Sequence, residues 1–162
     1  MITTFEADGN AIPFRDALGR FATGVTLVTT MTDQGPVGMV ANSFASVSLD
    51  PPLVLWSPAR SSSRFVHFER AERFAIHILG HDQAHVSAAF GRGGPGFADL
   101  DHDVGDHGAP LVNGVLARFE CTTHATHDGG DHLIVVGRVG RVTVGDGDPM
   151  IFNQGRFGRF AG

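Results

Sequence analysis

Small polar side chains interrupt residues 38–52, a segment where an ordinary core strand would carry apolar residues. Asn42, Ser43, Ser46 and Ser48 stand within a loosely alternating pattern. Small side chains leave backbone N–H and C=O groups accessible, and asparagine and serine add neutral hydrogen-bond donors and acceptors. This combination suits a flat heterocycle with amide-like edges. A polar edge strand exposed to water is the alternative interpretation.

Three consecutive serines, Ser61, Ser62 and Ser63, stand between Arg60 and Arg64. The apolar residues that follow predict a short helix with a serine N-cap. Hydroxyls, free backbone N–H groups and flanking arginines at a helix start can hold a phosphate. All 12 basic residues of the chain are arginine, so no lysine can contribute. A plain capping cluster is the alternative.

Other segments resemble known cofactor-binding or metal-binding motifs but lack residues that those motifs require. Residues 91–96 satisfy G-x-G-x-x-G, but the fingerprint of a dinucleotide fold requires a strand before it and a helix within it. The acidic run at residues 99–103 lacks the glycine and the glutamate of a calcium loop. One cysteine and nine scattered histidines do not make a zinc site, and no bound metal is expected. Cys121 lies within a predicted strand and is interpreted as a buried small hydrophobe.

The elements that must position these residues are mostly strands. Apolar and β-branched runs predict strands at residues 25–30, 37–49, 53–56, 74–79, 114–126 and 131–144. The last two are joined by a turn predicted at residues 128–130. Short helices are expected over residues 12–21, after the serines, and from a cap at Asp82. Residues 91–108 predict a long loop, which we interpret as a mobile cover. The fold class is therefore mainly β, an antiparallel barrel with a few short helices.

Composition limits the function classes. With 162 residues and 42% hydrophobic residues, one domain spanning residues 1–162 is expected, with residues 1–11 as a loose leader. The net charge of −5 and the absence of a basic run exclude an electrostatic surface for nucleic acid or an anionic membrane. A single cysteine excludes an intramolecular disulfide. With neither a signal peptide nor a long apolar run, a cytoplasmic location is expected.

Five blocks, in order, carry a resemblance to a known family: residues 14–26, 38–52, 74–79, 130–139 and 148–152. Together they resemble the flavin reductase components of two-component flavin-dependent monooxygenases, over about residues 14–160. The resemblance implies an FMN-binding split β-barrel that works as a homodimer. It also implies that the chain reduces FMN or FAD with NADH, or with NADPH, and passes the reduced flavin to a separate monooxygenase.

The family's contacts carry over onto particular residues. The flavin contacts are Met39, Val40, Ala41, Asn42, Ser43 and Phe44 for the isoalloxazine, Ser46 and Val47 for the ribityl chain, Ser61, Ser62 and Ser63 for the phosphate side, and Phe90 and Gly91 for a loop over the flavin tail. Backbone N–H groups near Asn42 and Ser43 are expected to face the flavin pyrimidine edge. The nicotinamide contacts are His132, Gly155, Arg156 and Phe157, and Phe157 replaces the tyrosine of many relatives.

His132 is the candidate catalytic residue, and we expect it to position the nicotinamide amide or ribose rather than to transfer a proton. A surface histidine of a hairpin turn is the alternative. The choice between NADH and NADPH stays open, because Arg92, Arg156 or Arg159 could each meet a 2′-phosphate. Two other functions stay open as well: a flavin-binding barrel without catalysis, and an oxidase or oxygenase that retains its flavin.

Overall fold

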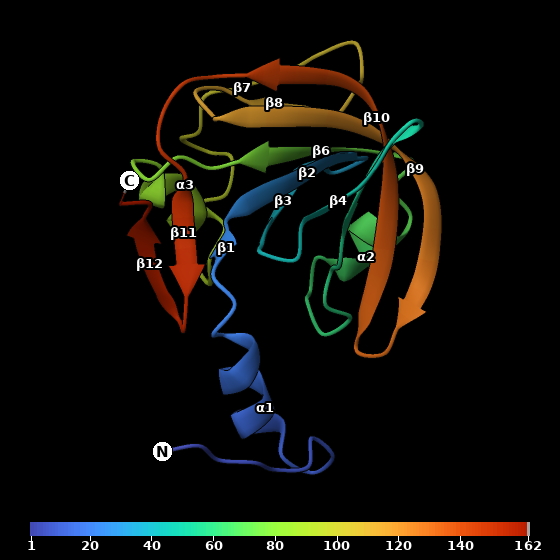
Figure 1. Cartoon of the computed structure of the whole chain (residues 1–162). Helices are drawn as coiled ribbons and strands as arrows, with labels where there is room; N and C mark the ends of the chain where they lie inside the picture. Colours follow the sequence, from blue (N-terminus) through green and yellow to red (C-terminus); the bar gives the residue numbers. More distant parts are fainter. Residues whose placement is uncertain (162) are drawn as a thin grey trace.

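The computed structural model describes residues 1–161, and its main feature is a seven-stranded antiparallel sheet (Figure 1). In sheet order its strands are β3 (Gly35–Ala41), β2 (Thr26–Thr32), β6 (Arg73–Ile78), β9 (Ala117–Gly129), β10 (His132–Val144), β5 (Pro52–Trp56) and β4 (Ala45–Leu49). Met39 of edge strand β3 and Val54 of β5 belong to one buried cluster. Because these two strands lie near opposite ends of the sheet order, the sheet curls around its core.

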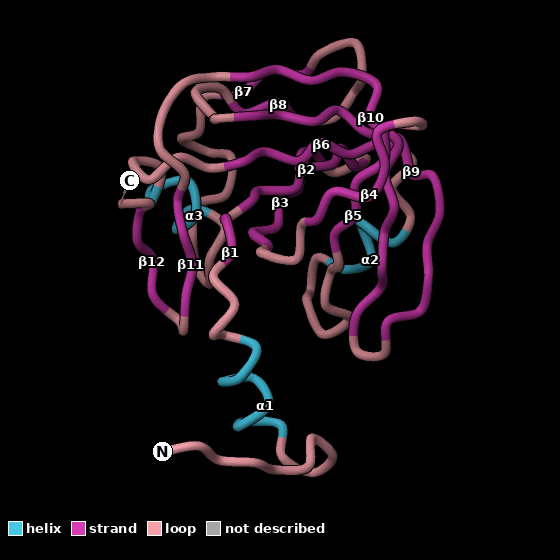
Figure 2. The backbone as a smooth tube through the Cα atoms, in the orientation of Figure 1, coloured by secondary structure: helices cyan, strands magenta, loops and turns pink. Residues whose placement is uncertain are grey.

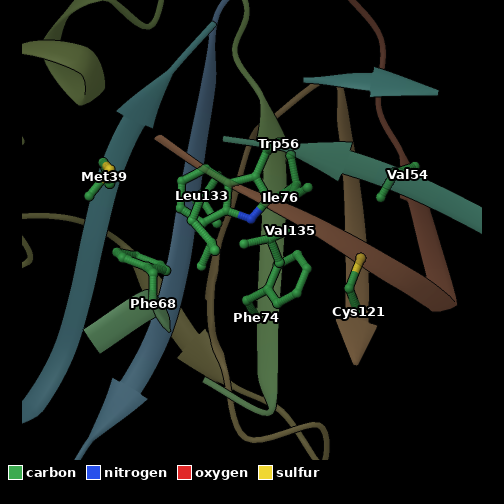
Figure 3. Packing of buried hydrophobic residues seen from close by; sticks show 10 residues of the cluster. Met39, Val54, Trp56, Phe68, Phe74, Ile76, Cys121, Leu133 and Val135 are labelled. Carbon is green, nitrogen blue, oxygen red and sulfur yellow. The ribbon is translucent and has the colours of Figure 1, made fainter. Parts of the chain in front are cut away.

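Aromatic residues fill that core. Trp56, on β5, meets Phe68 edge-on with ring centroids 5.0 Å apart, and Phe74 of β6 lies beside them (Figure 3). A Cβ at Gly137 would lie 2.6 Å from the Phe74 ring, so only glycine allows β10 to approach this ring so closely. Burial of these large side chains provides most of the driving force that holds the sheet closed.

Two smaller sheets accompany the barrel. One consists of β1 (Thr23–Gly24), β11 (Met150–Asn153) and β12 (Arg156–Arg159), and the other of β7 (His102–Val104) and β8 (Pro110–Val112). Between β11 and β12, Gln154 and Gly155 both have positive φ, 48° and 77°. Positive φ at both central residues is typical of a type I′ turn, whose twist suits a tight hairpin.

Helices are short and few (Figure 2). They are α1 (Ala11–Leu18), α2 (Phe65–Glu69) and α3 (Ala84–Ala89). The first of them has no buried residue and projects away from the barrel (Figure 1). Phe68 anchors α2 in the core, and Val86 anchors α3 in a second apolar cluster. Within residues 1–161, no helix combines the length and the apolar character needed to cross a bilayer.

The predicted fold class, mainly antiparallel β with few helices, is confirmed, but several elements differ from their predictions. The single strand predicted at residues 37–49 is two strands, β3 and β4, separated at residues 42–44. The first helix ends at Leu18, three residues early. The hairpin of β11 and β12 was not predicted, and the predicted loop at 91–108 contains β7. The β9–β10 turn lies at Gly130 and Asp131, because Gly129 pairs with His132.

Candidate functional site

The link between β3 and β4 presents the polar residues singled out in the sequence. The hydroxyl of Ser43 accepts a hydrogen bond from the Ser57 N–H at 2.9 Å and donates to the Ser57 carbonyl at 3.3 Å. Thr26 Oγ1 donates to the Ala41 carbonyl at 2.7 Å. These bonds hold both ends of the link, so the Ser43 hydroxyl has a structural task. Within residues 1–161, the exposed Asn42 amide forms no hydrogen bond and is available to a ligand.

A cavity of about 510 Å³ lies on one side of this link. Residues 42–45 form one wall, and residues 21–26 form the other. The Thr23 hydroxyl oxygen, on the second wall, is buried and has no hydrogen-bond partner in the described part of the chain. An unpaired buried polar atom is costly, and a bound polar group would relieve that cost. Neutral donors and acceptors at Asn42 and Thr23 therefore fit the edge of an uncharged heterocycle.

A second cavity, of about 500 Å³, lies between β3, α3 and the β11–β12 hairpin. It brings together Val40, Phe90, Gly91 and Phe157, three of them predicted flavin contacts and one a predicted nicotinamide contact. The Phe90 ring packs against β3 because Gly38 has no side chain; a Cβ there would lie 2.5 Å from the ring. The walls are almost entirely apolar, which suits the face of an aromatic ring system.

The serine segment differs from its prediction. The N-cap of α2 is Arg64, without a side-chain capping bond, and the Ser62 hydroxyl instead accepts the Arg64 N–H at 3.2 Å. A serine bonded to the residue two positions later forms a local turn, and the helix begins after it. Ser61 and Ser63 are exposed. A helix of five residues has a weak dipole, so the hydroxyls and the turn's N–H groups would have to hold the predicted phosphate.

The two flanking arginines already have partners in the protein. Arg60 forms an ion pair with Asp128 at 2.9 Å and lies over the Phe65 ring. The Arg64 guanidinium donates to the Phe90 carbonyl at 2.7 Å. This charge-assisted bond joins the serine segment to the start of the predicted flavin-covering loop, so it brings two separately predicted parts of the site together.

His132 lies at the tip of the β9–β10 hairpin. Its Nδ1 lies 2.6 Å from the Asp131 carboxylate, and this hydrogen bond is the main cause that lowers the pKa of Asp131. A carboxylate only accepts, so Nδ1 carries the proton and Nε2 stays free for a ligand. The Arg60 N–H donates to the Asp131 carbonyl at 2.9 Å. His132 therefore lies beside the serine segment.

The other predicted nicotinamide residues, Gly155, Arg156 and Phe157, lie on the β11–β12 hairpin. Phe157 packs on Phe152 with ring centroids 5.3 Å apart. Among residues 1–161, no hydrogen bond, ion pair or cavity joins these residues to His132, and Figure 1 shows the two hairpins at different sides of the barrel. One copy of the chain therefore does not bring the two halves of the predicted nicotinamide site together.

In two other predicted flavin residues, Met39 and Phe44, the side chain packs against the protein itself. Met39 is buried in the core, and the Phe44 ring stacks on Phe119 with centroids 5.7 Å apart. A contact with flavin at either position would come from the backbone. Ser46 and Val47 are exposed on β4, where the pairing with β5 shifts register. That bulge turns their side chains outward at the barrel edge.

Buried groups elsewhere have structural roles. His77 donates from Nδ1 to the Leu27 carbonyl at 2.9 Å and accepts the Val112 N–H at 3.0 Å; burial lowers its pKa to about 4. Burial also raises the pKa of the Cys121 thiol to about 12, which confirms its interpretation as an unreactive hydrophobe. Among the described residues, no three His, Cys, Asp or Glu side chains form a group that could hold a metal ion.

Several lining residues were not singled out in the sequence. Thr23, Gly38, Ala84 and Met150 shape the two cavities, and they come from four separate segments. The only sequence signal among them was Gly38 inside a predicted strand, since glycine in a strand often marks a close approach. Another cavity, of about 620 Å³, contains none of the predicted residues; Arg70 is among those that line it.

Comparisons with known proteins agree with this geometry. Residues 18–161 match the family described as "Flavin reductase like domain". An "FMN reductase (NADH)" from Agrobacterium fabrum is 59% identical over 152 residues, which cover 94% of this chain and 87% of that protein. The reductase subunit HsaB of a flavin-dependent monooxygenase from Rhodococcus jostii is 39% identical, with 89% and 75% covered. The solved structure of the NADH:FAD oxidoreductase SgcE6 from Streptomyces globisporus superposes with a TM-score of 0.92 at 35% identity, and the match covers 100% of this chain and 94% of that one.

Proposed function

The chain belongs to the flavin reductase-like domain family, and from this premise we propose that it is an NADH-dependent flavin reductase that supplies reduced flavin to a separate monooxygenase. The observation that carries the proposal is the family match over residues 18–161, together with two cavities, one lined by the polar β3–β4 link and the other by Val40 of β3. The predicted fold class, activity and cofactors all agree with the relatives.

The residues present fit a flavin. The N–H groups of the β3–β4 link and the Asn42 amide would hold the pyrimidine edge, where negative charge grows on reduction. Val40, Phe90 and Gly91 would enclose the apolar part of the ring, and Ser61–Ser63 would meet the phosphate side. When bound, the flavin supplies the redox chemistry, because its N5 accepts a hydride from C4 of the dihydronicotinamide. The protein's contribution is alignment of the two rings, which can supply several kcal/mol of the barrier reduction, roughly 7–11 in well-oriented systems.

We further propose that the chain works as a homodimer. Three apolar side chains in and just after α1 are largely exposed: Ile12 is 73%, Leu18 59% and Phe21 79% exposed. This exposure is costly, and within residues 1–161 the helix has no buried residue. A second copy would cover this apolar surface. It would also allow His132 of one copy to meet the β11–β12 hairpin of the other. A cytoplasmic location, where NADH is available, belongs to the same proposal.

The dimer proposal is tested by light scattering coupled to size-exclusion chromatography. We expect twice the chain mass for the wild type and the single-chain mass for Leu18→Glu, because a charge on the covered face is costly. Val104→Glu, on another exposed apolar residue that lies outside α1, is the matched control and should stay dimeric. A wild-type protein that elutes at the mass of one chain would refute this part of the proposal.

The activity is tested by following NADH oxidation at the nicotinamide absorbance band with added FMN, FAD or riboflavin. We expect turnover with FMN, and a flavin KM raised about fivefold in Asn42→Ala, because the variant loses one hydrogen-bonding group that contributes about 1 kcal/mol. Gln34→Ala, on the exposed β2–β3 turn, is the control. No oxidation despite flavin binding would indicate a flavin carrier, and a yellow protein that keeps its flavin on dialysis would indicate an oxidase or oxygenase.

A further inference from the structure

A third cavity continues the apolar one beside Phe157. It has a volume of about 260 Å³ and shares Ala84, Met150 and Phe157 with the cavity that contains Val40 and Phe90. Its own additional residues are His81, Gly158 and Arg159. The two cavities therefore adjoin at these shared residues, and together we call them the groove. Its inner end carries Val40 and Phe90, and its outer end, which we call the mouth, carries His81 and Arg159.

The two walls of this mouth come from different parts of the chain. His81 follows β6, and Arg159 ends β12, so they approach the groove from the α3 side and from the hairpin side. Figure 1 shows α3 directly behind β11 and β12. Backbone bonds hold both walls: the His81 N–H donates to the Asp148 carbonyl at 2.9 Å, and the Met150 N–H donates to the Leu79 carbonyl at 3.0 Å. Met150 is also the strand partner of Arg159.

The side chains of Arg159 and His81 have no ion pair or hydrogen bond with other residues of the described chain. Among residues 1–161, Arg159 forms no ion pair, although Asp82 and Asp148 lie on neighbouring segments, and the His81 ring forms no hydrogen bond. In contrast, Arg60 and Arg64 are both engaged by other groups of the chain. Within the described residues, the mouth of the groove therefore has a guanidinium without an ion pair and an imidazole without a hydrogen bond.

We infer that this mouth binds the pyrophosphate of NADH while the nicotinamide lies deeper in the groove, past Phe157. The inference rests on the proposed function, which supplies the dinucleotide. A guanidinium can bind two phosphate oxygens at once, and an imidazole N–H adds a single donor from the opposite wall. The apolar walls of the inner cavity suit the nicotinamide ring, and the charged end suits the pyrophosphate. Arg159 and His81 are thus positioning residues for the hydride donor.

ADP-ribose tests the inference without catalysis, because it contains the pyrophosphate but lacks the nicotinamide. Its Kd is measured by calorimetry on the flavin-free chain. We expect Arg159→Gln to weaken binding about tenfold or more, the usual effect of losing a charge-assisted hydrogen bond, and His81→Ala to weaken it less. Arg70→Gln is the matched control, since Arg70 is an exposed arginine that lines a separate cavity.

Kinetics with two hydride donors separates pyrophosphate binding from other roles of Arg159. In Arg159→Gln, the KM for NADH should rise about tenfold with kcat nearly unchanged, and the KM for 1-benzyl-1,4-dihydronicotinamide, which has no phosphate, should not change. Equal ADP-ribose affinity in Arg159→Gln and Arg70→Gln would overturn the inference. An equal rise in KM for both hydride donors in Arg159→Gln would overturn it as well. Either result is compatible with NADH oxidation by the wild type. A wild-type chain that oxidises neither donor would instead refute the proposed function itself.

Discussion

Protonation of His77 should destabilise the fold as the pH falls. The ring is fully buried, where its Nδ1 proton is donated to Leu27 and its Nε2 accepts the Val112 N–H. Adding a proton at Nε2 would place two donors against each other and would charge a desolvated ring. Burial is the main cause that lowers the pKa to about 4, and the nearby Arg118 charge lowers it further. We therefore expect the neutral form to be required for folding.

The size of the effect follows from the two pKa values. The unfolded chain takes up a proton at His77 near pH 6.5, whereas the folded chain does so only near pH 4. Above pH 6.5 both states are neutral, and this group adds no pH dependence. Between pH 6.5 and 4 the unfolded state binds more protons, so stability falls by about 1.4 kcal/mol per pH unit, up to about 3 kcal/mol in total.

The assay is urea unfolding of the wild type and His77→Gln at several pH values between 4.5 and 7.5. Glutamine keeps a donor and an acceptor but cannot be protonated in this range. We expect the variant to be less stable at pH 7.5, yet to lose stability with falling pH less steeply, by up to about 1.4 kcal/mol per pH unit. The other histidines and the carboxylates contribute equally to both proteins. Parallel curves over the whole range would refute the reasoning.

Three further predictions concern the site and its surroundings. Gly38→Ala should displace the Phe90 ring, lower the unfolding free energy by about 1–3 kcal/mol and weaken FMN binding in a fluorescence titration, whereas Gly140→Ala, whose Cβ would meet only one atom at 3.8 Å, should do neither. Arg64→Gln should lower FMN affinity as well, because the serine segment loses its bond to Phe90; unchanged affinity would argue against a joined site. Cys121 should resist a thiol reagent until the chain unfolds, and fast labelling of the native protein would contradict its burial.

Elements that depend on local sequence could be predicted. The β-branched run in β2 and the apolar run in β6 specify strands by themselves, because both strands are buried on both faces and this requires continuous apolar residues. The apolar run in β5 also specifies a strand, although its burial alternates. The break between β3 and β4 could not be predicted in this way. It depends on the Ser43–Ser57 bonds, which join residues 14 apart and exist only after β5 has paired. The missed hairpin at β11 and β12 did have a signal, glycine after glutamine, but each of its strands has only four residues.

The site was predictable in its parts but not in its assembly. Polar residues at 42–46 and the serine run were visible in the sequence, and the family resemblance supplied Phe90, His132 and Phe157. The bond between Arg64 and Phe90 is a tertiary contact between residues 26 positions apart. His132 lies beside the serines rather than beside Phe157 because of the course of the 13-residue strand β10. Neither arrangement has a periodicity that a sequence can reveal.

A crystal structure of the chain with FMN tests the central claim most directly. We predict the isoalloxazine beside the β3–β4 link, with its pyrimidine edge at Asn42 and its apolar edge toward Val40 and Phe90. FMN seated elsewhere, for instance in the separate 620 Å³ cavity beside Arg70, with the link left free, would contradict the account.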